Sequence, residues 1–320
     1  MLYMVNGADQ EKKVGFLKSK KRRNFDELCF TRTHNVLLPC YIMHCYFFSP
    51  ACPLQFLPTN YQRSIEMKSQ HTNTDLSAAS FIPCTSEEFI SKINSVPVDS
   101  SGDFMFELTG VEISDAKVAN KRLLGGAFAY SKLSNITFVN CNLGKADFTH
   151  CDMHNVTFLR CRIPNSRFDF ARFDNVRFIE CDLMSGRWRF SSGTVEVKSA
   201  SLYGLEMHHS SVEAVMENCS GEYIDMSYSP EISVNCRNCD FHNGHFTDSS
   251  FSGSMVKCIF TKADFSGTYA EKLTFTECGM RDINLTGAIG IDLARNHAED
   301  EDVDEEEDFE FDFKFSKIPF

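Results

Sequence analysis

Apolar residues recur with a period of five over much of the chain. From Leu108 to Trp188 an apolar or aromatic residue occupies every fifth position, seventeen times in succession. The residue two places earlier is usually small or β-branched, as at Ala146 and Val156. This spacing matches neither the roughly 3.6 residues per turn of an α-helix nor the alternation of a flat strand. It suits a square coil in which each pentapeptide makes one side and one corner, and four units complete a turn of twenty residues.

Three units of this coil are one residue short. The pattern places the short steps between Trp188 and Ser192, between Val212 and Met216, and between Val256 and Phe260. One position followed through these steps is cysteine in seven of eight turns, and the column reads Cys141, Cys161, Cys181, Ala200, Cys219, Cys239, Cys258 and Cys278. The column one side earlier is expected to contain Ser254. Intact columns indicate that the short steps are tightened corners within one continuous coil.

The repeated cysteines are predicted to be packing residues. Parallel stacking keeps neighbouring Cβ atoms about 4.8 Å apart, beyond the usual ~3.8 Å of a disulfide. Buried thiols in apolar surroundings are also inert. A zinc-like run contains Cys236, Cys239, His242 and His245. In this register its cysteines point inward and its histidines outward, so we predict no metal site there. No triad-like arrangement lies on one face and no phosphate loop is present, so we predict no catalytic residue and no cofactor.

Three segments of the coil carry a resemblance to a known family. GKADFTHCDM, PNSRFDFARF and FTKADFSGTY resemble pentapeptide-repeat proteins, which have a loose A-(D/N)-(L/F)-x-x pattern. The resemblance implies an all-β fold, a right-handed quadrilateral β-helix of about nine coils over residues 106–290. It indicates little about function, because the same fold hosts many roles.

The two ends of the coil are predicted to carry different extensions. Residues 86–105 are expected to be an N-terminal helical cap, because Thr85 to Glu88 has the residues of a helix start and Pro97 would end a helix over Ser86–Val96. Residues 291–320 are expected to be a disordered acidic tail, with ten acidic residues between Glu299 and Glu310. The tail either solubilises the protein or binds a partner through Phe309, Phe311 and Phe313, and its FEFDFKF run could also add a strand to the last coil.

The segment before the cap differs from the coil in composition. Residues 67–85 include a polar stretch rich in Ser, Thr and Asn, predicted to be disordered and similar to the export signals of type III secretion effectors. Residues 1–66 share neither composition nor periodicity with the rest, and we hypothesise that they are a non-native or disordered extension and that translation begins at Met67. The apolar residues 36–57 contain three prolines and a central His44, so no stable membrane insertion is expected.

Charge is distributed unevenly along the chain. The net charge of −12 divides into +1 for residues 1–105, −4 for 106–290 and −9 for 291–320, so binding to nucleic acid is not expected. Five arginines occupy outward positions on successive sides of neighbouring coils: Arg162, Arg167, Arg172, Arg177 and Arg187. This arginine belt either binds an acidic protein face or phosphate, or is a solvated surface paired with carboxylates such as Asp147, Asp152, Asp174 and Asp182.

These features favour a non-catalytic protein-binding scaffold. The resemblance implies a bacterial type III secreted effector that acts on host proteins inside the host cell, or otherwise a protein of the bacterial cytoplasm. The alternative is a DNA mimic that binds a type II topoisomerase (gyrase), as some pentapeptide-repeat proteins do, but a coil of charge −4 with an arginine belt would be a poor mimic. A HECT-like ubiquitin ligase module, found in some effectors that this chain resembles, is not expected in the thirty residues after the coil.

Overall fold

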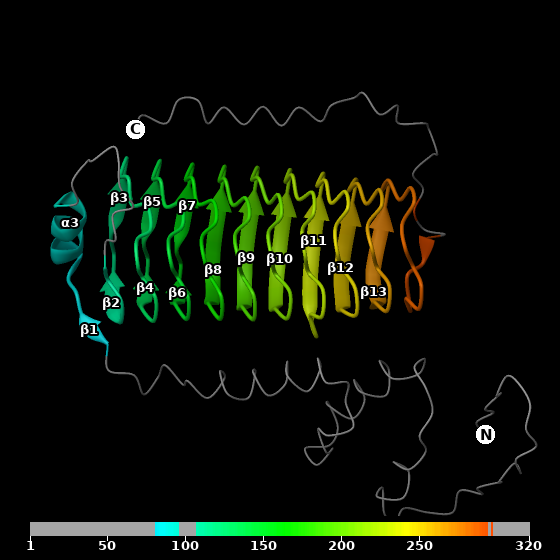
Figure 1. The fold of residues 1–320 in the computed structure, drawn as a ribbon, viewed down its shortest axis with the longest axis horizontal. Coiled ribbons are helices and arrows are strands. Elements are labelled where there is room, and N and C mark those ends of the chain that lie inside the picture. The colour runs from blue at the N-terminus through cyan, green and yellow to red at the C-terminus, as the bar shows by residue number, and fades with distance from the viewer. Residues whose placement is uncertain (1–80, 96–106, 294–295, 297–320) are drawn as a thin grey trace, which may run out of the picture. The chain divides into compact units, whose positions relative to one another are not determined.

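The computed structural model describes residues 81–95, 107–293 and 296, and shows a parallel β-solenoid over most of them (Figure 1). All strand pairs are parallel, and the main path runs β1-β2-β4-β6-β8-β9-β10-β11-β12-β13. The strands are β1 (Ile82–Pro83), β2 (Val111–Ser114), β3 (Lys117–Ala119), β4 (Lys132–Ser134), β5 (Thr137–Val139), β6 (Asp152–His154), β7 (Thr157–Leu159), β8 (Arg172–Ile179), β9 (Ser192–Lys198), β10 (Ser211–Glu217), β11 (Ile232–Arg237), β12 (Ser250–Val256) and β13 (Tyr269–Thr276).

Each turn of the solenoid has four sides. Side one contains β2, β4, β6 and the first halves of β8 to β13, and side two contains β3, β5, β7 and the second halves. Sides three and four are joined from turn to turn by isolated bridges, such as Asn142 to Arg162 on side three and Asp147 to Arg167 on side four. The nine strands of the main path from β2 to β13 are separated by eight turns, and the bridge from Tyr269 to Ile289 begins one more. The four-sided all-β coil predicted from the sequence is confirmed.

Stacked phenylalanine rings fill the core. On side four the ring centroids of Phe128, Phe148 and Phe168 are 4.7 Å apart, nearly parallel. On side two Phe138, Phe158 and Phe178 form a second stack, which meets the first edge to face. All six are fully buried. The period of five therefore reports the core positions correctly over these coils.

The cysteine column lies in the core, as predicted, and its thiols have a second role. Cys141, Cys161 and Cys181 are fully buried, and all ten described cysteines are free thiols. Each of these three Sγ atoms donates to a backbone carbonyl of the previous coil, as Cys181 does to Phe158 at 3.3 Å. Serines at the equivalent position of other sides do the same, for example Ser166 Oγ to Leu143 at 2.8 Å. The column therefore holds small side chains that can donate weakly to a carbonyl group.

The buried thiols are expected to resist alkylation in the native protein. Burial raises the pKa of the Cys151 thiol to about 12, so only about one molecule in ten thousand would carry a thiolate there at pH 8. Site-resolved mass spectrometry of the full chain after iodoacetamide treatment should find Cys141, Cys151 and Cys161 unmodified without denaturant and modified in urea. Modification of these three residues within minutes under native conditions would show that the core opens readily.

The structure corrects the position of two of the three short steps. Phe173 pairs with Gly193, and after a register shift Val176 pairs with Val195, so Gly193 takes the inward position and Ser192 is exposed. Likewise Val234 pairs with Gly253 rather than Ser254.

The short steps therefore run from Gly193 to Val197, from Val212 to Met216 and from Phe251 to Met255, and all three turn from side one into side two. The step from Ile232 to Cys236 is also four residues long, but a six-residue step from Met226 to Ile232 offsets it. The predicted step at Val212 was correct. At the other two places, neighbouring residues are small or apolar, so spacing alone does not show which of two consecutive units lost the residue.

The N-terminal end of the solenoid is covered by β1 and α3 (Ser86–Asn94) (Figure 1). The expected helix start is present, because the Glu88 amide donates to Thr85 Oγ1 at 3.1 Å and the Thr85 amide donates to Glu88 Oε2 at 2.9 Å. Phe89 and Ile93 of α3 are buried. Strand β1 was not predicted, since two residues carry no periodic signal, and its Pro83 is tolerated at a sheet edge.

Several predictions concern residues outside the described part of the chain. They include residues 1–66, residues 67–80 of the export-like segment, and Phe309, Phe311 and Phe313 of the tail. Among the described residues, no helix has the length and apolar character required to span a membrane.

Candidate functional site

One corner of the solenoid carries a continuous stack of aromatic side chains. Where side four turns into side one, six successive coils place Tyr130, His150, Phe170, Phe190, His209 and Tyr228. Neighbouring ring centroids are 4.8 to 5.5 Å apart and the rings lie within 25° of parallel. We call this stack the aromatic ladder.

The backbone at the ladder is unfavourable for aromatic residues. All six residues have positive φ, between 54° and 61°, a region that bulky side chains rarely adopt and that costs on the order of 1 kcal/mol or more. The corner between sides one and two has the same geometry but uses Asn135, Asn155 and Asn175, whose side-chain amides are hydrogen-bonded between coils at 3.1 and 2.7 Å. Ring stacking contributes about 0.5–1.5 kcal/mol per pair, so it can offset the backbone cost, which asparagine at the same positions would largely avoid.

The ladder presents ring edges to its surroundings. The two end rings are the most exposed, with Tyr130 at 48% and Tyr228 at 36%, and the four between them are half-buried. Because each inner ring is covered on both faces by its neighbours, the accessible part is its edge. Ring edges carry partial positive charge and attract carboxylates, carbonyl oxygens and the faces of other aromatic rings.

The arginine belt surrounds the solenoid in the same coils as the inner residues of the ladder, whose six residues we call its rungs. Three of the five arginines flank the ladder. Arg167 and Arg187 lie on side four and Arg172 on side one, immediately before and after the ladder corner. Arg162 on side three and Arg177 on side two face other directions. The predicted placement on four successive sides is therefore confirmed, and the belt is not one patch.

Most of the belt is paired with carboxylates. The ion pairs are Arg162 with Asp182 at 3.9 Å, Arg167 with Asp147 at 3.6 Å, Arg177 with Glu196 at 3.2 Å and Arg187 with Asp169 at 4.0 Å. Two of these, with Asp147 and Asp182, were expected, whereas Asp174 pairs with His154. Within the described residues Arg172 has no carboxylate within 4.0 Å. Exposed pairs contribute only about 0–1 kcal/mol each, so the belt alone does not define a site.

A buried ion pair supports the middle of the ladder. Asp169, 2% exposed, precedes the Phe170 rung, and Arg189 precedes the Phe190 rung one coil later. Arg189 donates from Nε at 3.0 Å and from Nη2 at 2.8 Å to the two carboxylate oxygens, and its backbone amide donates at 3.2 Å. Asp169 raises the pKa of Arg189 through these hydrogen bonds. The pair ties the two coils together where the ladder is half-buried.

Sequence reasoning missed the ladder and Arg189, although a signal was present. The rungs follow one another at intervals of 20, 20, 20, 19 and 19 residues, the spacing that the short steps impose on the coil. The cysteine column was visible because one residue type repeats. The ladder was hidden because Tyr, His and Phe share only an aromatic ring, and because its corner position is neither of the two inward positions of the unit.

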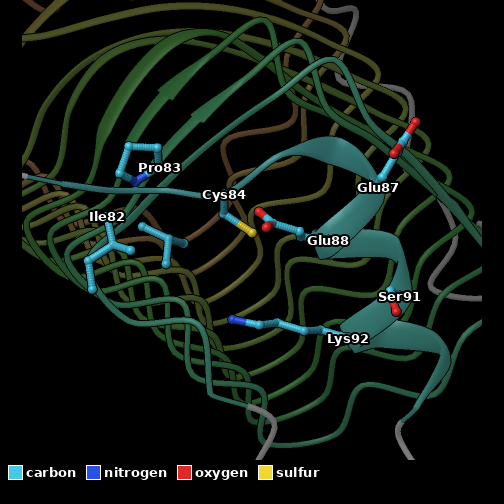
Figure 2. Close-up of a pocket in the computed structure, with 8 residues that line it drawn as sticks. Ile82, Pro83, Cys84, Glu87, Glu88, Ser91 and Lys92 are labelled. Carbon is cyan, nitrogen blue, oxygen red and sulfur yellow. The ribbon is translucent and has the colours of Figure 1, made fainter.

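The zinc-like run is divided by the wall of the solenoid, as its register predicted. Cys236 and Cys239 are 2% and 1% exposed in the core, His242 is half-buried and His245 is exposed. A depression with a volume of about 580 Å³ lies elsewhere, between α3 and the β1–β2 edge (Figure 2). It is open and lined by residues that include Cys84, Glu88 and Lys92. Burial raises the pKa of Cys84, which makes this thiol a poor nucleophile.

Two comparisons found proteins to which this chain is similar. The family model described as pentapeptide repeat region matches residues 111–188. Similar solved structures include a trypsin-treated form of QnrB1, a plasmid-mediated fluoroquinolone resistance protein, with 20% identity over 55% of this chain and 90% of that chain and a TM-score of 0.29. Another is HetL from the cyanobacterium Nostoc sp. strain PCC 7120, a pentapeptide repeat protein involved in heterocyst differentiation regulation, with 16% identity over 64% of this chain and 92% of that chain and a TM-score of 0.30.

No curated protein matches the chain in sequence. The family match covers the first coils, and the same four-sided turn with its buried columns continues to Ile289. Residues 111–188 are therefore a pentapeptide repeat region.

Proposed function

We propose that this protein is a non-catalytic scaffold that binds a protein partner along the aromatic ladder. The observation that carries the proposal is the set of six aromatic residues held at positive φ on one corner. Positive φ recurs at the other corners of the coil as well, so what distinguishes this corner is that all six positions carry aromatic rings, where asparagine would tolerate the conformation better. Aromatic residues and arginine are also the residue types most enriched where protein interfaces gain their binding energy.

The chemistry around the ladder defines the partner surface that would fit. The ring edges favour oxygen atoms and aromatic faces. Arg172 adds positive charge on side one, and Arg167 and Arg187, which are ion-paired with Asp147 and Asp169, present guanidinium groups on side four. A partner with carboxylates beside exposed apolar or aromatic side chains would satisfy both. The rigid stack loses little conformational entropy on binding, because its rings are already ordered by their neighbours.

A change in the ladder that preserves the backbone provides the test. Asparagine tolerates positive φ, so Phe170→Asn combined with Phe190→Asn should fold while removing the two central rings. Proximity labelling in cells should lose at least tenfold in the recovery of the partners that the natural chain labels. The control is Tyr223→Asn, an exposed aromatic residue at φ 59° on another corner, which should label the same partners as the natural chain. Equal labelling by the ladder variant would rule out this surface.

Delivery into a host cell is a separate part of the proposal. It is supported by the polar composition of Met67 to Ser80, which is similar to secretion signals, and it would place the scaffold inside the host. A translocation reporter fused to a chain that starts at Met67 should enter host cells only when a type III secretion system is active. Entry that does not depend on the system would remove the effector role and leave the binding surface untouched.

DNA mimicry at gyrase is the second candidate, and the surface favours it less. A mimic needs a continuous acidic face, whereas side four carries Arg167 and Arg187 at the middle of the coil. A supercoiling assay with added protein should therefore show no change in gyrase activity.

A further inference from the structure

The two ends of the solenoid differ in how well their core is covered. At the C-terminal end, the inward residues Met280, Ile283, Leu285 and Ala288 are only partly buried. One coil earlier, the equivalent residues Phe260, Ala263, Phe265 and Thr268 are 0 to 1% exposed. At the N-terminal end, by contrast, Leu108 and Ile113 are 2% and 0% exposed beneath β1 and α3. The last coil is therefore an apolar layer that no other described element covers.

Among the described residues, the backbone of the last coil is also unpaired along most of its outer edge. Its bridges, such as Asp264 to Asn284 and Tyr269 to Ile289, all point back to the previous coil, and within the described residues no strand pairs on its outer side. Asn296 closes one point of this edge, because its side chain accepts from the Cys278 amide at 2.8 Å and donates to the Cys278 carbonyl at 2.7 Å. An open edge next to an apolar layer is what a solenoid cap normally covers.

We propose that Phe309–Phe315 of the same chain is this cap. The segment reads Phe-Glu-Phe-Asp-Phe-Lys-Phe, and in an extended chain alternate side chains point to opposite faces. One face therefore presents Phe309, Phe311, Phe313 and Phe315 together, while Glu310, Asp312 and Lys314 point to solvent. Because this period is two rather than five, the segment does not continue the coil as another turn. It suits an extended strand laid across the open layer.

The length of the linker favours the chain's own tail over other occupants. Twelve residues lie between Asn296 and Phe309, and the thirteen Cα-to-Cα steps, at ~3.3–3.6 Å each, span up to about 45 Å. Nine of the ten residues from Glu299 to Asp308 are acidic, a composition that favours a solvated linker. A tethered segment has an effective concentration near the millimolar range, so it outcompetes a second copy of the chain at micromolar concentrations. This cap is independent of the binding role proposed for the aromatic ladder.

Hydrogen exchange of the full chain tests the cap. In Phe311→Ser with Phe313→Ser, amides of residues 279–291 should exchange at least tenfold faster than in the natural chain, and amides of β6 to β8 should be unchanged. The matched control is Glu305→Gln with Glu306→Gln in the linker, which should not alter exchange. Unchanged exchange at 279–291 in the phenylalanine variant would overturn the proposal.

Photocrosslinking distinguishes the tail from a second copy of the chain. A benzoylphenylalanine placed at position 311 of the full chain should crosslink to residues 280–291 within one molecule. In a mixture of isotope-labelled and unlabelled protein, such crosslinks join peptides of the same label, and light scattering should give a monomer mass. Mixed-label crosslinks from a dimer, or crosslinks only to other coils, would show that the tail does not cap its own solenoid.

Discussion

Gly193→Ala is expected to remove about 3–5 kcal/mol from the free energy of unfolding, or to prevent folding. Gly193 has φ 103°, and a Cβ atom there would lie 1.8 Å from the carbonyl oxygen of Phe173 in the previous coil. That contact is with backbone, so no side-chain rotation can relieve it. Glycine is required because the tightened corner brings the two coils into close approach at this position. Gly253, with φ 111° and 2.0 Å to the Val234 carbonyl oxygen, should respond in the same way.

The single tryptophan reports this loss directly. Trp188 is fully buried against Phe173, with ring centroids 5.2 Å apart, one unit before Gly193. Urea unfolding followed by its fluorescence should show a large fall in the midpoint for Gly193→Ala. Gly279→Ala is the matched control, because a Cβ atom there meets no atom within 4 Å and φ is not positive. A midpoint for Gly193→Ala equal to that of Gly279→Ala would mean that the corner is not held as the structure shows it.

The parts of the fold that the sequence predicts are those encoded by one residue type at a regular interval. Inward positions such as Phe148 and Phe158 follow from a period of five, and the cysteine column follows from an interval of twenty. The positions of the short steps could not be located from the sequence alone, because Ser192 and Gly193 are both small and either could have been the inward residue. Only the register opposite Phe173 distinguishes them, since a close approach between coils is not visible along one chain.

The candidate site was less predictable for a related reason. Sequence patterns show which residues point inward, but an outward residue such as Phe170 matters because of the rings stacked on it from neighbouring coils. The arginine belt was found because its residues are alike, and the structure shows that only Arg167, Arg172 and Arg187 share a corner. Arg189 was overlooked because its partner, Asp169, occupies an outward position that happens to be buried.

Arg189→Met is expected to cost about 3–5 kcal/mol, the usual penalty when one partner of a buried ion pair is removed. The methionine keeps the apolar stem but removes the guanidinium that satisfies both oxygens of Asp169, whose side chain is 4% exposed. Of the cations among the described residues, only Arg187, at 4.0 Å, then remains beside this carboxylate. Asp169→Asn should cost less, about 1 kcal/mol, because the amide oxygen can still accept from the Arg189 backbone and Arg189 is 31% exposed to water.

The double variant tests whether the loss of stability in Arg189→Met comes from the buried charge of Asp169. Asp169→Asn with Arg189→Met should be more stable than Arg189→Met alone, because the buried carboxylate that lost its two guanidinium hydrogen bonds is gone. Arg167→Met is the control, since its pair with Asp147 is 3.6 Å long and the arginine is 45% exposed, so it should cost at most about 1 kcal/mol. If Arg189→Met and Arg167→Met unfold at the same urea concentration, the buried pair does not stabilise the two coils.

If the pair does hold the Phe170 and Phe190 rungs in register, Arg189→Met should also weaken partner labelling along the aromatic ladder, whereas Arg177→Met on side two should not.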